Sequence, residues 1–200
     1  TSGTANILTL GALVNYLPDF AQSPQAEGAL NTFKTNLSQI VSAIKNSNPD
    51  VTLLVATQYN PYSYLAKEYG TSFTQAQTIS DAFDDGVQVL NTAITQAAQT
   101  EGFTVVDVYT AFETAVAQDK NPCNPPVDIQ KFSISLDFHP NQDGHDLIAS
   151  TISDTLNKMS KKYDLWVSGI RVTSDNAGNV LGDNTVSYAA DTNTLTLSGA

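Results

Sequence analysis

Cysteine, tryptophan and histidine are nearly absent from this sequence. The 200 residues include one Cys, one Trp and two His. A single Cys excludes a framework of internal disulfides, and Cys123 is left either as a free thiol or as a link to a partner outside the chain. Both histidines fall within one short stretch, residues 135–149.

Positive charge is also scarce. Lys and Arg number 9 against 20 Asp and Glu, which gives a formal net charge of −11. Such a chain repels the phosphates of nucleic acid, so nucleic acid is excluded as a partner, and an anionic membrane surface is disfavoured. Only 14% of the residues are charged, and uncharged polar residues take their places, as is common in exported proteins. We expect an extracellular or cell-surface protein whose leader is no longer on the chain.

Long hydrophobic runs are missing as well. No apolar segment approaches the length of a membrane span, so no membrane span is expected. A chain of this length forms one domain, or one domain with an appendage. It can bury roughly 70% of its unfolded surface, enough for a sizeable core.

Two kinds of apolar segment alternate over residues 1–163. Short buried runs predict strands, and longer runs with apolar positions three or four residues apart predict amphipathic helices. The strands are expected at 6–14, 51–57 and 103–108, and the helices at about 25–46, 80–100, 110–118 and 141–162, with 60–77 irregular. This alternation predicts an α/β domain, a three-layer α/β/α arrangement around a parallel sheet.

The character of the sequence changes after Tyr163. Residues 165–173 alternate loosely, 175–179 read as a turn, and 185–188 and 194–198 read as short strands. We therefore divide the chain into an α/β domain at 1–163 and a small β appendage, or the start of a second module, at 164–200.

The stretch 135–149 carries the strongest chemical signal. Asp137 precedes His139 by two residues, and a loop His held beside a carboxylate is what a base-assisted nucleophile needs. One alternative is a polar loop that only caps the next helix through Asn141, a good N-cap type. Another is a metal site built from the acids and histidines of the stretch, namely Asp137, His139, Asp143, His145 and Asp146.

Residues 5–162 resemble the second half of an SGNH (GDSL-type) hydrolase. Asp137-Phe138-His139-Pro140-Asn141, with Gly144-His145, is similar to the last conserved block of that family. The run 50–62, a strand followed by a Tyr-Asn-Pro loop, supports the resemblance. The resemblance implies a flavodoxin-like fold with strands 3-4-5 of the family present. It also implies an esterase or lipase acting on carboxylic esters, acetylated carbohydrate among them, without cofactor or metal.

The resemblance also assigns roles to residues. His139 would be the general base and Asp137 the group that orients it, while a Ser attacks the ester and amide groups stabilise the oxyanion. Leu13 and Val14 stand where the family has an Asn-Asp pair. Gly11 and Asn15 are therefore only weak candidates as oxyanion donors.

The loop after the second strand is the expected substrate loop. Tyr59, Asn60 and Tyr62 follow directly on the apolar run 51–57. Loops that follow parallel strands carry the ligand sites of open α/β sheets. Aromatic loops also commonly pack against the sheet, and Asn60 has the character of a turn former.

The chain departs from the family pattern in two further ways. The Gly-Asp-Ser-Leu block is absent, and the family Asp normally stands three residues before the His. Without the first two strands of the family, residues 6–14 would form an open apolar edge, which natural proteins avoid. We therefore expect an N-terminal half, as a separate chain, a cleaved partner or a swapped copy, that supplies the nucleophilic Ser. The alternative is a non-catalytic binding or structural module of a multi-domain cell-surface protein.

Overall fold

The computed structural model describes residues 4–5, 15, 19–71, 74–124, 127–128, 133–135, 137 and 139–198. The chain forms two compact units, Thr1–Ser153 and Asp154–Ala200. Each unit has hydrophobic clusters of its own. The sequence-based boundary between 1–163 and 164–200 stays a prediction.

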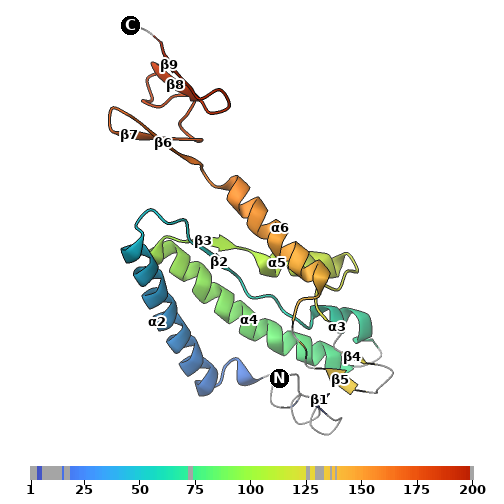
Figure 1. Ribbon diagram of the computed structural model, residues 1–200. Helices are drawn as coiled ribbons and strands as arrows, with labels where there is room; N and C mark the ends of the chain where they lie inside the picture. Colours follow the sequence, from blue (N-terminus) through green and yellow to red (C-terminus); the bar gives the residue numbers. More distant parts are fainter. Residues whose placement is uncertain are drawn as a thin grey trace. The chain divides into compact units, whose positions relative to one another are not determined.

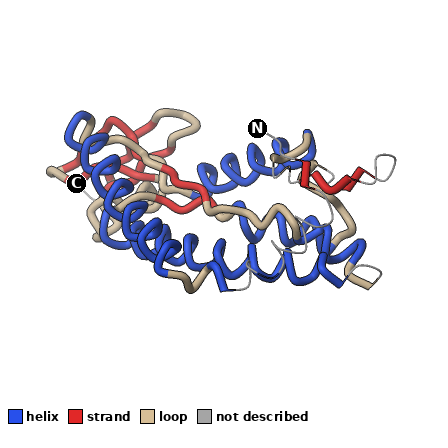
Figure 2. Tube along the Cα trace, turned by 90° about the horizontal axis from the view of Figure 1, so that it is seen from below, coloured by secondary structure: helices blue, strands red, loops and turns tan. Residues whose placement is uncertain are grey.

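Helices dominate the first unit (Figures 1 and 2). Within the described residues they are α2 (Pro24–Ser47), α3 (Ser63–Tyr69), α4 (Thr74–Glu101), α5 (Val108–Ala117) and α6 (Gln142–Lys158). The four helices predicted from periodicity are confirmed, with shifted ends for α4 and α6. The prediction that 60–77 is irregular was wrong, because α3 and the first turn of α4 lie there. α3 is short and its N-cap residue Tyr62 makes no side-chain capping bond, so it lacks the usual start signal.

Local sequence explains where several helices begin and end. Ser23 accepts a hydrogen bond from the amide of Ala26 at 3.2 Å, and Pro24 fits the first turn of α2. Gly102 ends α4 with a φ of 72°, a left-handed conformation that glycine adopts without a Cβ clash. Asp107 caps α5 by accepting from the amide of Thr110 at 3.1 Å. None of the described helices is both long and apolar enough to cross a membrane.

One parallel pair of strands lies in the first unit. β2 (Leu54–Ala56) pairs with β3 (Thr104–Val106), so that Leu54 lies opposite Thr104. The expected strand at 6–14 lies outside the described residues. The described residues also include an antiparallel sheet that the sequence did not predict, formed by β1 (Thr4–Ala5), β5 (Ser133–Ser135) and β4 (Val127–Asp128) in that order.

Hydrophobic clusters cover both faces of the β2–β3 pair. Val55 and Val105 pack against a cluster that includes Val41 of α2 and Ile94 of α4. Leu54 and Val106 belong to a second cluster with residues of α5 and α6, among them Phe112, Leu147 and Ile148. Alternate strand residues point to opposite faces, so the two clusters pack against opposite faces of this pair.

The second unit is built from two β-hairpins. β6 (Lys162–Val167) pairs with β7 (Ile170–Thr173), and β8 (Val186–Ala189) pairs with β9 (Thr194–Leu197). The turn between β6 and β7 places Ser168 at φ 51° and Gly169 at φ 80°, as a two-residue hairpin requires. The predicted strands at 185–188 and 194–198 are confirmed. Val172, Val180 and Val186 form the buried centre of this unit.

Candidate active site

Asp137 and His139 lie in direct contact in the segment that leads from β5 to α6. The Nδ1 atom of His139 is 2.6 Å from Oδ1 of Asp137, and the backbone amide of His139 donates to the same oxygen at 3.0 Å. The other carboxylate oxygen, Oδ2, accepts a hydrogen bond from Nδ2 of Asn124 at 3.1 Å. The His139 side chain is 70% exposed.

These hydrogen bonds favour the ionised form of Asp137. The backbone amide of His139, then its ring, and then Asn124 hold the pKa of Asp137 below its usual range. Asp137 is therefore ionised at neutral pH and favours a proton on Nδ1 of His139. In that tautomer the lone pair on Nε2 is the proton acceptor, the arrangement needed for general-base catalysis. The spacing of two residues thus allows the carboxylate–imidazole contact, with the amide and the ring of His139 reaching the same carboxylate oxygen.

The loop 121–124 holds this pair in place. The amide of Asn124 donates to the carbonyl of His139 at 2.9 Å, and Cys123 forms an isolated β-bridge with Pro140. Nδ2 of Asn141 donates to the carbonyl oxygens of Asn121 at 2.7 Å and Cys123 at 3.0 Å. The Asn141 side chain also caps α6 by accepting from the amide of Gly144 at 3.0 Å. The N-cap role predicted for Asn141 is confirmed.

Two tyrosines and the buried thiol of Cys123 lie near the Asp137 carboxylate. Tyr59 stacks on Phe112 with ring centroids 4.3 Å apart. Burial raises the pKa of Tyr59 and of Tyr62 to about 12, and the Asp137 charge contributes to both increases. Both phenols are therefore neutral at physiological pH, and both lie close enough to Asp137 for its charge to affect their pKa.

The expected substrate loop is largely buried. Tyr62 is 1% exposed and Asn60 is 4% exposed. Nδ2 of Asn60 donates to the carbonyl of Ser80 at 3.0 Å, and its Oδ1 accepts from the amide of Tyr62 at 3.0 Å. Asn60 therefore forms a turn and ties the loop to α4. A substrate contact by Tyr59, Asn60 or Tyr62 stays a prediction.

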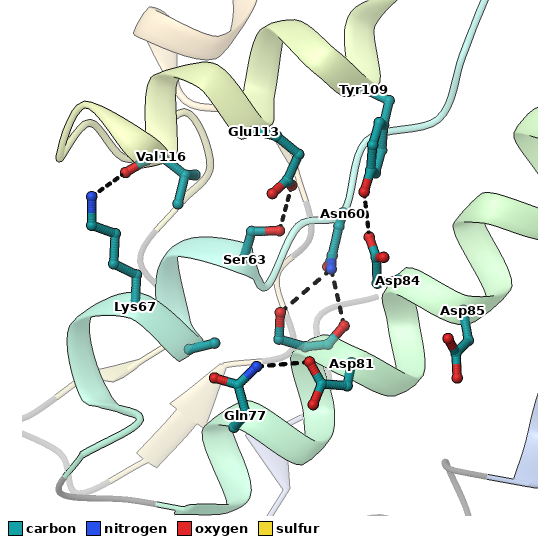
Figure 3. A pocket seen from close by; sticks show the side chains of 12 residues that line it. Asn60, Ser63, Lys67, Gln77, Asp81, Asp84, Asp85, Tyr109, Glu113 and Val116 are labelled. Carbon is teal, nitrogen blue, oxygen red and sulfur yellow. Dashed lines mark hydrogen bonds between the residues drawn. The ribbon is translucent and has the colours of Figure 1, made fainter.

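A polar cavity of about 460 Å³ adjoins this loop (Figure 3). The Ser63 hydroxyl donates to Oε1 of Glu113 at 2.5 Å, and the Tyr109 hydroxyl donates to Oδ1 of Asp84 at 2.7 Å. Burial raises the pKa of Glu113, and the nearby charge of Asp84 adds to the increase, while the Ser63 hydrogen bond opposes it. The lining combines carboxylates, hydroxyls and amides with the ammonium group of Lys67.

The remaining sequence candidates are not brought to the pair by any contact that the structure describes. Asn15 is exposed, and Gly11 lies outside the described residues, so their oxyanion role stays a prediction. Among the described side chains, no three His, Cys, Asp or Glu residues are grouped so as to hold a metal ion. Cys123 is 2% exposed, and burial raises the pKa of its thiol to about 12. These properties disfavour the thiolate and argue against Cys123 as a covalent link.

Sequence reasoning missed the part played by the loop 121–124. Its repeated Asn and Pro residues indicate a turn, but they do not indicate which distant residues the loop contacts. Asn124 is thirteen residues from Asp137 along the chain, and its amide reaches the carboxylate only after the chain has folded back. Asn-Pro on both sides of Cys123 was the available signal for a rigid loop.

Residues 10–147 match the family model described as the GDSL-like Lipase/Acylhydrolase family. The match covers more than half of the chain and includes the β2–β3 pair and the Asp137–His139 pair. No curated protein and no solved structure gives a significant match. The family implies an α/β hydrolase-like fold and a hydrolase of ester type. With the resemblance seen in the sequence thereby confirmed, the chain belongs to the GDSL-like Lipase/Acylhydrolase family.

Proposed function

We propose that this chain carries the acid–base half of a serine esterase that hydrolyses carboxylic esters. The observation that carries the proposal is the 2.6 Å contact between Asp137 and the exposed ring of His139. An ionised carboxylate on Nδ1 leaves Nε2 as the base, which is the role that an ester hydrolase needs from its His. The hydrolase family of the chain agrees with this chemistry.

The proposed reaction proceeds in two steps. The hydroxyl oxygen of a Ser attacks the ester carbonyl carbon while Nε2 of His139 takes the hydroxyl proton. The C–O bond to the alcohol then breaks, and His139 returns the proton to the leaving oxygen. In the second step His139 takes a proton from water as the water oxygen attacks the acyl carbon; the bond between that carbon and the Ser oxygen then breaks, the acid leaves, and His139 returns the proton to the Ser oxygen. Asp137 keeps the ring in one orientation and stabilises the imidazolium that forms in each step.

The nucleophilic Ser, in this proposal, comes from an N-terminal segment or a partner chain. The family places that Ser at the end of its first strand, and residues 1–200 contain no Gly-Asp-Ser-Leu block. The partner would also pair with the edge strand expected at 6–14. The exposed position of the His139 ring supports the proposal, because a Ser approaching from outside this chain would have access to it.

The proposed substrate is a small ester or an acetylated carbohydrate, and the proposed location is outside the cell. The hydroxyl-rich and acidic cavity beside the Tyr59–Tyr62 loop supports a carbohydrate as the alcohol part of the ester. The low content of charged residues supports an exported protein.

The test is hydrolysis of p-nitrophenyl acetate by the complete protein, with the segment that supplies the Ser. We expect His139→Ala to lower kcat by roughly 10³-fold or more, because the nucleophile loses its base. The control is His145→Ala, which alters the other His, exposed in the first turn of α6. This control is expected to leave kcat unchanged.

A fluorophosphonate probe identifies the nucleophile in the same protein. We expect the probe to label a Ser outside residues 1–200, and mass spectrometry of the labelled peptide gives its position. A labelled Ser within 1–200 would refute the split site. Absence of both labelling and hydrolysis would refute the esterase and leave the second candidate.

That second candidate is a non-catalytic binding module of a multi-domain cell-surface protein. Leu13 and Val14, in the places of the family Asn-Asp pair, favour it because neither side chain can donate a hydrogen bond to an oxyanion. The second compact unit fits a multi-domain protein. Hydrolysis that depends on His139 would exclude this candidate.

A further inference from the structure

We infer that Asn124 is a positioning residue that fixes the plane of the Asp137 carboxylate, and through it the tautomer of His139. This inference rests on the proposed function, because it assigns Asn124 a part in the action of the catalytic pair. Asn124 does not touch the reacting atoms. Its effect passes through the carboxylate that holds the imidazole.

The carboxylate is held at both of its oxygens. Oδ1 of Asp137 accepts from the backbone amide and lies 2.6 Å from the ring nitrogen of His139, while Oδ2 accepts from Nδ2 of Asn124 at 3.1 Å. Bonds to one oxygen alone leave the group able to rotate about its χ2 torsion, which has broad minima. The bond from Asn124 to the second oxygen opposes that rotation and favours the orientation in which Oδ1 points at Nδ1.

Asn124 is itself held rigidly relative to His139. Its backbone amide donates to the carbonyl of His139 at 2.9 Å, so one residue contacts both members of the pair. The bridge between Cys123 and Pro140 and the two hydrogen bonds from Asn141 fix the loop on either side. A donor on a fixed backbone loses little entropy when it makes its bond, which makes it suitable for orienting a catalytic group.

The amide of Asn124 is also the right chemical group for this position. It donates to the ionised carboxylate and contributes to holding the pKa of Asp137 below its usual range. Loss of the donor therefore raises the pKa of Asp137. A second carboxylate in its place would raise that pKa further, because two adjacent negative charges repel.

The experiment compares Asn124→Leu, which keeps the approximate size of the side chain but has no donor, with the unaltered full chain. NMR of the ring nitrogens of His139 reports which nitrogen carries the proton in the neutral imidazole. We expect the proton on Nδ1 in the unaltered chain and a shift toward Nε2 in Asn124→Leu. We also expect kcat to fall about ten- to a hundredfold with little change in KM, since the Nε2–H tautomer cannot act as base.

Asn124→Asp and Asn121→Ala separate the donor from the loop. In Asn124→Asp the Asp137 carboxyl, followed by NMR of its labelled carbon, is expected to titrate at higher pH than in the unaltered chain. The Asn121 side chain accepts from the amide of Cys123 at 3.1 Å and does not bond the Asp137 carboxylate. Asn121→Ala removes that one bond and leaves the Cys123–Pro140 bridge and the two Asn141 bonds in place, so the Asp137 titration and the His139 tautomer are expected to stay unchanged.

Each outcome bears on the inference. An unchanged tautomer and Asp137 titration in Asn124→Leu would overturn it, as would equal shifts in Asn121→Ala, which would indicate a general effect of the loop. Shifts specific to Asn124 in a protein that does not hydrolyse esters would support the positioning role and refute only the proposed function. If Asn124→Leu fails to fold, the tautomer of His139 in Asn124→Asp, which also lacks the amide donor, still decides.

Discussion

Gly144 occupies the point where the first turn of α6 meets the loop 121–124. A Cβ built on this residue would lie 2.0 Å from the carbonyl oxygen of Pro122 and 2.9 Å from Cβ of Pro140. The Pro122 carbonyl is held in place, because its oxygen accepts a hydrogen bond from the backbone amide of Asn141 at 3.1 Å. The close approach therefore requires glycine for steric reasons.

Gly144→Ala is expected to lower the free energy of unfolding of the first unit by about 1–3 kcal/mol, the usual cost of overpacking a fixed site. Displacement of the loop also moves Asn124 away from Asp137, so ester hydrolysis is expected to fall. Urea denaturation and p-nitrophenyl acetate assays measure the two effects.

Gly28→Ala is the matched control, because nothing lies within 4 Å of a Cβ at that position in α2. Alanine in an open helix interior is expected to stabilise by about 0.5–1 kcal/mol. Equal stabilities for the two Ala variants would show that the loop does not pack on Gly144 as described.

For single residues, the sequence predicted chemical roles better than it predicted which residues contact one another. Asp137 and His139 were identified from residue type and near spacing, and the Asn141 cap from its place before a periodic run. Asn124 was missed, because a long-range hydrogen bond depends on where two loops meet. For Asn60 the sequence offered a substrate contact and a turn former; its side chain bonds the Ser80 carbonyl as a turn former does, and the substrate contact stays a prediction.

Two lysines stabilise the ends of helices other than their own. The last turns of α4 and α5 contain no basic residue that would offset their carbonyl dipoles. Lys45 of α2 donates to the carbonyl oxygens of Glu101 and Gly102, at the end of α4. Lys67 of α3 likewise donates to carbonyl oxygens at the end of α5. Each lysine thus joins two helices through carbonyl oxygens at the C-terminal end of one.

Lys67→Met keeps the length of the side chain and removes its charge. The Nζ atom of Lys67 donates to the carbonyl oxygens of Val116 at 2.6 Å and Ala117 at 2.9 Å. Their loss is expected to lower the free energy of unfolding by about 0.3–1 kcal/mol, the usual range for a cation at a helix C-terminus. Urea denaturation at low salt measures this change in the free energy of unfolding.

Asp119→Asn separates the helix effect from the ion pair. Lys67 lies 2.7 Å from Oδ1 of Asp119, whose side chain is 82% exposed. An exposed ion pair contributes little, so this variant is expected to change stability less than Lys67→Met does. A larger effect for Asp119→Asn would assign the stabilisation to the ion pair instead.

For the helices, the apolar periodicity of the sequence predicted which segments are helical, and the capping residues predicted where those helices begin and end. α2 was predicted to within a few residues because Leu30, Phe33 and Leu37 repeat on one face and Asn48-Pro49 stops it. α3 was missed because a helix of seven residues is too short to display a period. Its single buried residue, Leu65, gives no pattern.

Because the two compact units have separate cores, we expect each unit to have its own free energy of unfolding. Val172 is 0% exposed in the second unit, and Val106 is 1% exposed in the first. Val172→Ala is expected to cost about 2 kcal/mol in the second unit alone and to leave ester hydrolysis unchanged. Val106→Ala is expected to destabilise the first unit instead.

Hydrogen exchange read separately over residues 19–124 and 160–198 distinguishes the two effects. Loss of protection confined to the altered unit is the expected result in each variant. Loss of protection across both units in Val172→Ala would show that the chain unfolds as one cooperative body.

The sequence by itself determined the alternation of strands and helices, the β-rich end, and the residue types of the acid–base pair. These depend on local periodicity and on which side chains can hold or move a proton. Tertiary structure decided the register in which β2 and β3 pair, and that an amide from a distant loop holds the Asp137 carboxylate. It also decided which lysine stabilises which helix. Those contacts join residues far apart in the chain, and such pairs are selected by packing in three dimensions rather than by any period along the sequence.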